Sequence, residues 1–143
     1  VVPMPVRPLV LDLRGVPALV GACLVSPWIA WFIGWAASGF DGVLDFGIDV
    51  AGWIPACLAA STIYRILKGR RIALRLLNPV VAVLGGQVTG ILCFVPVFMW
   101  FYGIPLSKLS HVITILLARV VLTFTVASPI LKAVEKAVTC VTR

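Results

Sequence analysis

NPVVAVLGGQVTGILCFVPVFMWFY, residues 78–102, is a long apolar stretch without a single charged side chain. A helix needs about 20 such residues to cross the hydrocarbon core of a bilayer. The stretch opens with Asn78-Pro79, a helix-start pattern, and closes with an aromatic cluster that is typical of a membrane interface. The cluster consists of Phe98, Trp100, Phe101 and Tyr102. The sequence therefore predicts a transmembrane helix over 79–102.

The composition of the whole chain agrees with a membrane protein. Of its 143 residues, 62% are hydrophobic and only 12% are charged, and the mean hydropathy is +1.13. A soluble domain has about a quarter charged residues, so lipid suits this chain better than water does. We expect an all-α, polytopic helical bundle that forms one transmembrane domain over 1–143.

Two further apolar stretches predict spans on either side of this helix. One covers 49–67, with Trp53 near its acidic end and Tyr64 at its basic end, where interfacial aromatic residues belong. The other covers 112–131. Residues 132–143 place their apolar side chains on one helical stripe, so we expect a helical tail along the cytoplasmic surface.

The apolar stretch from Val16 to Ala37 has two interpretations. Ser26-Pro27 interrupts it, and a proline in the first turn with a serine before it is a helix-start signal. The stretch is therefore either one span or two short helices over 16–26 and 27–39. Residues 1–15 are rich in proline and carry charges, so they are not expected to cross a membrane as a helix.

The charges predict which ends of the spans face the cytoplasm. The densest basic group begins at the end of the 49–67 span and continues into the loop after it, with Arg65, Lys68, Arg70, Arg71 and Arg75. The stretch from Ser38 to Asp49 carries three aspartates and no basic residue. Because basic loops stay inside, we expect a cytoplasmic C-terminus, with the acidic loop and the turn at Gly103 outside. The basic residues are not interleaved with stacking aromatics, which argues against nucleic acid as a partner.

Arg119 lies inside the last predicted span, where a guanidinium costs about 3 kcal/mol. It therefore needs an internal carboxylate, a snorkelling route to the interface, or a polar ligand. Asp49 and Trp53 lie one turn apart at the outer end of their helix. This pair fits either a helix cap with an interfacial anchor or a site for a flat polar ligand.

Small residues recur at four-residue spacing and predict close helix packing. The pairs are Ala30 with Gly34, Ala56 with Ala60, and Gly86 with Gly90. Gln87 lies beside the last pair, where its amide can bond to a neighbouring helix.

Catalytic and metal-binding patterns are missing from the sequence. The four cysteines form no C-x-x-C pair and His111 is the only histidine, so we expect packing cysteines, no metal and no cofactor. No nucleophile–base set, zinc-protease helix or phosphate-binding lysine loop occurs. The chain is therefore not expected to be an enzyme, and ATP hydrolysis would fall to other subunits.

The order of several elements resembles the substrate-binding S-components of energy-coupling factor (ECF) vitamin transporters, nearest the riboflavin type. LDLRGVPALVG, residues 11–21, is similar to a loop and second helix of that family, and Ser26-Pro27 falls where its third helix opens. Ile63-Tyr64-Arg65 is similar to the end of its fourth helix, and residues 85–105 are similar to its fifth. Arg119 falls near a ligand-binding position of its sixth helix.

The resemblance implies a plasma-membrane importer subunit that captures a small water-soluble vitamin at the outer face. The partners implied are the lipid bilayer, a T-subunit and ATPase subunits. An outer loop over 1–15 and two short helices, 16–26 and 27–39, are also implied. The residues expected to bind substrate are Asp12, Arg14, Asp49, Trp53, Trp100 and Arg119. A structural or assembly membrane protein without a ligand is the alternative.

Three departures from the family pattern qualify these expectations, one of them the lack at residues 36–39 of the Lys-Asn often found at the end of the third helix. The first of its six helices, which docks the T-subunit, has no counterpart before Val1, so we expect about five helices and a truncated start. Arg14-Gly15 replaces a Ser-Asp pair of the riboflavin loop, so the vitamin need not be riboflavin.

Overall fold

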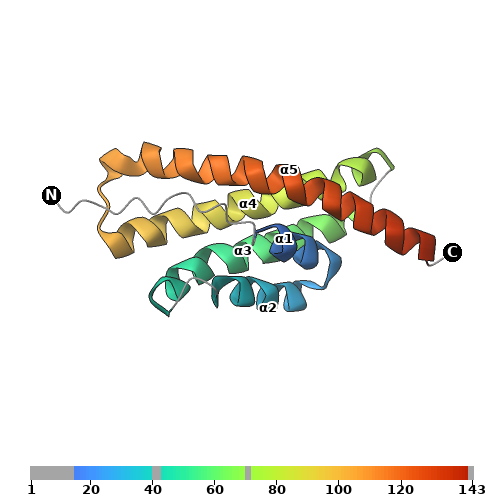
Figure 1. Cartoon of the computed structure of the whole chain (residues 1–143), viewed down its shortest axis with the longest axis horizontal. Helices are drawn as coiled ribbons and strands as arrows, with labels where there is room; N and C mark the ends of the chain where they lie inside the picture. Colours follow the sequence, from blue (N-terminus) through green and yellow to red (C-terminus); the bar gives the residue numbers. More distant parts are fainter. Residues whose placement is uncertain (1–14, 40–42, 70–71, 142–143) are drawn as a thin grey trace.

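Five α-helices and no strand make up the part of the chain that the computed structural model describes, residues 15–39, 43–69 and 72–141 (Figure 1). The helices are α1 (Gly15–Leu24), α2 (Pro27–Ser38), α3 (Val43–Lys68), α4 (Ile72–Tyr102) and α5 (Leu109–Val141). A short 3₁₀ turn, η2 (Leu106–Lys108), precedes α5. The predicted all-α bundle, with two short helices before three long ones, is confirmed.

Three segments within the described residues are long and apolar enough to cross a membrane. They are Gly47–Lys68, Leu77–Tyr102 and Leu106–Val138. Large apolar side chains face outward, such as Trp28 at 86% and Leu92 at 69% exposure, while Asn78 is only 2% exposed. Such a surface is unsuited to contact with water, because soluble monomers rarely expose large contiguous apolar patches. The chain is a membrane-embedded helical protein.

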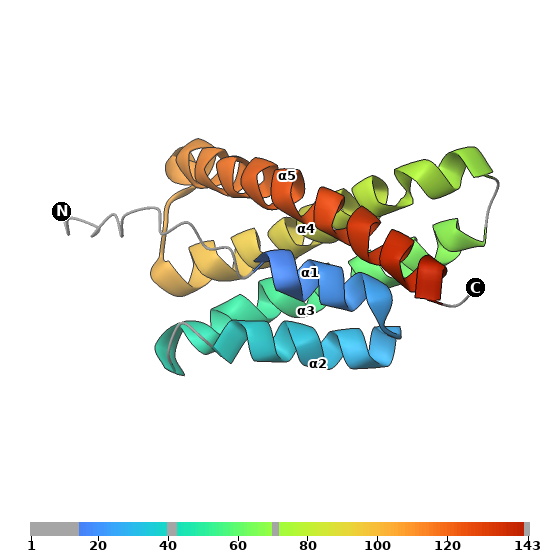
Figure 2. The same ribbon diagram turned by 45° about the vertical axis from the view of Figure 1, so that its right-hand side comes forward.

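Helices α3 and α4 form the antiparallel centre of the bundle (Figures 1 and 2). Their backbones approach closely, because a Cβ atom on Gly86 would lie 2.7 Å from the carbonyl oxygen of Ala56. A Cβ atom on Gly90 would lie 2.9 Å from the carbonyl oxygen of Gly52. Ala60 also borders Gly86. The small residues therefore form the contact between the two central helices.

Helices α1 and α2 form a hairpin that packs on α3. The hydroxyl of Ser61 donates a hydrogen bond of 2.8 Å to the carbonyl of Val25, in the turn between the two short helices. Farther along α2, Ala30 is fully buried, and a Cβ atom on Gly34 would lie 2.8 Å from the Ile54 Cα atom. The hairpin is thus joined to α3 at its turn and along α2.

Helix α5 packs against α4 and α1 and crosses the bundle obliquely (Figure 2). Its inward face buries Thr123 and Leu131, which are 1% and 0% exposed. Near its C-terminal end, the hydroxyl of Tyr64 in α3 donates a hydrogen bond to the Glu135 carboxylate. This bond joins α5 to α3, a helix far from it in sequence.

The long helices begin earlier than the sequence predicted. Helix α3 starts at Val43 rather than 49, α4 at Ile72 rather than 79, and α5 at Leu109 rather than 112. Pro79 lies inside α4 because a proline removes only one backbone hydrogen bond and the flanking apolar residues continue the helix. Arg75 accordingly belongs to α4, so placing it in a basic loop was wrong.

The connections between helices gather at two ends of the bundle. One end of the bundle, called here the basic end, contains the end of α3, the start of α4, the α1–α2 turn and the end of α5 (Figures 1 and 2). The start of α3 and the turn after α4 lie at the opposite end. In that turn Gly103 has a φ of +59°, which glycine adopts without strain.

Candidate functional site

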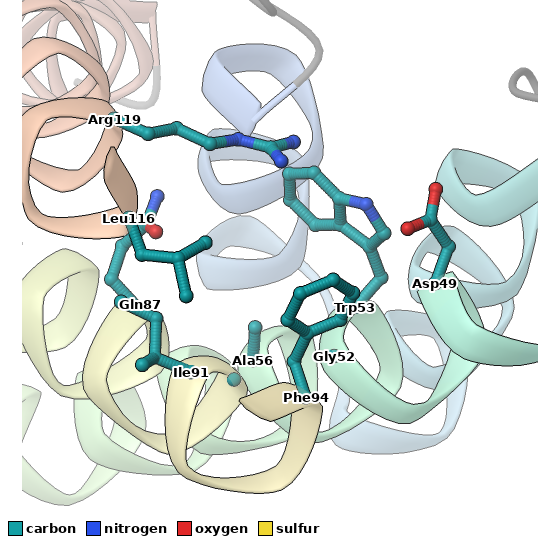
Figure 3. A pocket seen from close by; sticks show the side chains of 10 residues that line it. Asp49, Gly52, Trp53, Ala56, Gln87, Ile91, Phe94, Leu116 and Arg119 are labelled. Atoms are coloured by element: carbon teal, nitrogen blue, oxygen red, sulfur yellow. The ribbon is translucent and has the colours of Figure 1, made fainter. Parts of the chain in front are cut away.

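A pocket between the three long helices is formed by one face of each (Figure 3). Helix α3 contributes Asp49, Gly52, Trp53 and Ala56, α4 contributes Gln87, Gly90, Ile91 and Phe94, and α5 contributes Leu116 and Arg119. Within α3 and α4 these residues follow the spacing i, i+3, i+4 and i+7, which places them on one side of each helix. Charged and amide groups therefore meet at the inward faces of three largely apolar helices.

The guanidinium of Arg119 lies against the indole of Trp53. Its Cζ atom is 5.2 Å from the ring centroid, within the distance at which a cation is attracted by an aromatic face. Trp53 is only 9% exposed, so the contact is shielded from the surroundings. In Figure 3 the indole lies between the guanidinium of Arg119 and the carboxylate of Asp49. The aromatic ring thus separates a cation from an anion.

The pocket is small in this conformation. Its volume is about 50 Å³, which is room for one or two water molecules. Sites for drug-sized molecules measure about 300–1,000 Å³. Phe94 lines it next to α3, since a Cβ atom on Gly52 would lie 3.1 Å from the Phe94 Cβ atom. A vitamin would therefore require this pocket to widen.

The start of α1 lies next to the same indole. A Cβ atom on Gly15 would lie 3.0 Å from the Thr123 Cγ2 atom and 3.1 Å from the Trp53 Cη2 atom. The first described residue is therefore in contact with both α3 and α5. Asp12 and Arg14, predicted to bind substrate, lie outside the described residues.

The structure brings together three of the six residues predicted to bind substrate, namely Asp49, Trp53 and Arg119. Gln87, predicted only to support helix packing, also lines the pocket. Trp100 does not, because it is 82% exposed near the end of α4. Trp100 follows Phe94 by six positions, about 240° around the helix, so it lies on a different face of α4 from Gln87 and Phe94.

Sequence reasoning missed the aromatic wall that Phe94 provides. The signal was present, because Gln87, Ile91 and Phe94 are spaced by four and three residues and therefore share a helical face. Leu116 likewise lies one turn before Arg119. Phe94 and Leu116 can therefore be predicted as apolar residues that share a helical face with Gln87 and Arg119, respectively.

The fold and this pocket define a class, a helical membrane protein with a small, largely apolar pocket that three polar side chains border. No protein-family model, curated protein or solved structure matches the chain.

Proposed function

We propose that the chain is the membrane-embedded, substrate-binding subunit of an ECF-type importer, and that it captures a small water-soluble vitamin at the outer face of the plasma membrane. One observation carries this proposal, the meeting of Asp49, Trp53 and Arg119 at one pocket. Ionisable side chains inside a membrane are costly and usually mark a substrate or ion pathway. The resemblance to S-components rests mainly on other stretches of the chain, and Arg119 is the one residue of these three that it includes.

The position of the pocket supports capture from outside. Asp49 lies near the start of α3, at the end of the bundle opposite the basic end. Because basic segments remain in the cytoplasm, the pocket then faces the outer half of the membrane. The C-terminal end of α5 is cytoplasmic in this arrangement.

The chemistry of the pocket favours a flat molecule with a polar edge. Trp53 and Phe94 offer aromatic faces for a ring, while Asp49, Gln87 and Arg119 offer an acceptor, an amide and a donor. Riboflavin and other ring-containing vitamins have this character. The sequence has no phosphate-binding lysine loop, so a T-subunit and ATPase subunits would supply the energy for uptake.

Admission of a vitamin requires the pocket to widen, and α5 is the element suited to move. Of the three long helices it is the least buried within the bundle. It contributes Leu116 and Arg119 to the pocket. Outward displacement of α5 would separate Arg119 from Trp53 and expose both groups to a ligand.

Native mass spectrometry with small-molecule extraction, on protein purified in detergent from cells grown on rich medium, tests this proposal. We expect a vitamin to co-purify with the chain. Arg119→Ala should then weaken its binding at least tenfold, because the cationic anchor is lost, while the bundle stays folded. Lys108→Ala is the matched control, since that exposed cation lies outside the pocket. Unchanged affinity in Arg119→Ala would remove Arg119 from the site.

A second candidate is a structural or assembly membrane protein without a ligand. The close contact of Arg119 with Trp53 and the small pocket volume favour it. In that case no molecule co-purifies, a panel of vitamins gives no thermal shift, and Arg119→Ala lowers the thermal stability of the bundle.

A further inference from the structure

A second hollow opens at the basic end, where the α1–α2 hairpin meets the end of α3. Its volume is about 400 Å³, several times that of the pocket around Trp53. Its lining consists of Cys23, Leu24, Tyr64, Arg65, Lys68 and Gly69. The two hollows share no residue, so the function proposed for the first does not account for the second.

Two cations border this hollow, and each has a defined contact. The Nε atom of Arg65 donates a hydrogen bond of 3.4 Å to the carbonyl of Val25. The Nζ atom of Lys68 lies 5.9 Å from the centroid of the Tyr64 ring. Because the Arg65 bond uses only Nε, the terminal guanidinium nitrogens remain available as further donors.

The only carboxylate that the described residues bring near this hollow is that of Glu135. It accepts the hydrogen bond from the Tyr64 hydroxyl and does not line the hollow. The lining side chains therefore carry two positive charges and no negative one. Cys23, 2% exposed, and Leu24, 43% exposed, add an apolar part that continues toward the outer surface of the bundle.

We propose that this hollow binds a phosphate group, held by Arg65 and Lys68. Arginine pairs with phosphate through two parallel N–H···O bonds, and lysine adds a compact charge. The hollow lies where the Gly47–Lys68 segment ends, at the depth of lipid headgroups. Basic pockets between transmembrane helices on the cytoplasmic side bind anionic headgroups. The phosphate belongs either to an anionic phospholipid or to a free phosphate compound.

Native mass spectrometry of the delipidated full chain tests this proposal, with phosphatidylglycerol, phosphatidylcholine and inorganic phosphate as probes. We expect phosphatidylglycerol to be retained more strongly than phosphatidylcholine. The double variant Arg65→Gln/Lys68→Gln should lose at least tenfold in phosphatidylglycerol affinity. The control Lys132→Gln/Lys136→Gln removes two exposed cations of α5 that lie toward the basic end but outside the hollow. It should keep the phosphatidylglycerol affinity.

The competition arm distinguishes the two sources of phosphate. If millimolar inorganic phosphate displaces phosphatidylglycerol, the hollow binds free phosphate compounds. If phosphatidylglycerol stays bound, the hollow binds the lipid headgroup. Equal losses in the two double variants would overturn the proposal. If Arg65→Gln/Lys68→Gln does not fold, Lys68→Gln alone should still lower the phosphatidylglycerol affinity about threefold. An unchanged affinity in Lys68→Gln would overturn the proposal.

Discussion

At the scale of single residues, glycines set how closely the helices approach. A Cβ atom on Gly34 would lie 2.8 Å from both the Trp53 carbonyl oxygen and the Ile54 Cα atom. Both atoms belong to backbone, which cannot rotate aside as a side chain can. The distance between α2 and α3 therefore depends on the missing side chain at this one position.

Gly34→Ala should lower the stability of the bundle. Overpacking of this kind costs about 1–3 kcal/mol, because the two helices must separate. Thermal unfolding in detergent, followed by circular dichroism, should show a midpoint several degrees lower. Gly47→Ala is the matched control, since a Cβ atom on Gly47 meets nothing within 4 Å and alanine favours a helix. Equal midpoints for the two variants would contradict the close approach.

The surroundings of Arg119 could be predicted only in part from the sequence. A guanidinium inside an apolar span requires a partner, and hydropathy alone predicts that requirement. The position of the Trp53 ring beside it depends on the distance and rotation between α3 and α5, which no local pattern encodes. The small pocket volume was equally beyond prediction, because it depends on how side chains from three helices pack together.

At the scale of helices, the number and type of elements followed from hydropathy, whereas their limits did not. Ser26-Pro27 marked the break between α1 and α2, since proline suits a first helical turn. Pro79 suggested a helix start in the same way, yet it lies inside α4. A proline alone does not distinguish these cases, because the apolar residues before it decide whether a helix continues.

The hydrogen bond from Tyr64 to Glu135 makes α5 depend on α3 near the basic end. Tyr64→Phe should cost about 1 kcal/mol in the free energy of unfolding, because it removes the donor and keeps the ring. Glu135→Ala should cost more, since it leaves the hydroxyl of Tyr64, a residue only 3% exposed, without this acceptor. Glu135→Gln keeps an acceptor oxygen and should cost least.

Equilibrium unfolding in mixed detergent micelles would measure this order. An unchanged free energy of unfolding in Tyr64→Phe would show that ring packing, rather than the hydrogen bond, holds α5 at this point.

At the scale of the whole molecule, the charge distribution predicts one orientation. A membrane-impermeant maleimide should label Ser107→Cys in intact cells, because η2 lies at the end opposite the basic one. Lys136→Cys should react only after permeabilisation. Cys93→Ser and Cys140→Ser are included in both variants to remove the exposed thiol of Cys93 and the thiol near the C-terminus, while Cys23 and Cys57 are buried. Labelling of Lys136→Cys in intact cells would reverse the orientation.

The shortness of α1 and α2 has a consequence for how the protein is made. At about 15 and 18 Å, neither helix spans a hydrocarbon core of about 30 Å. Both precede α3 in the chain and therefore leave the ribosome before it. The faces that carry Ala30 and Gly34 find their partner only when α3 has been synthesised. Insertion of the hairpin must therefore wait for a later segment, so biogenesis does not follow the order of the sequence.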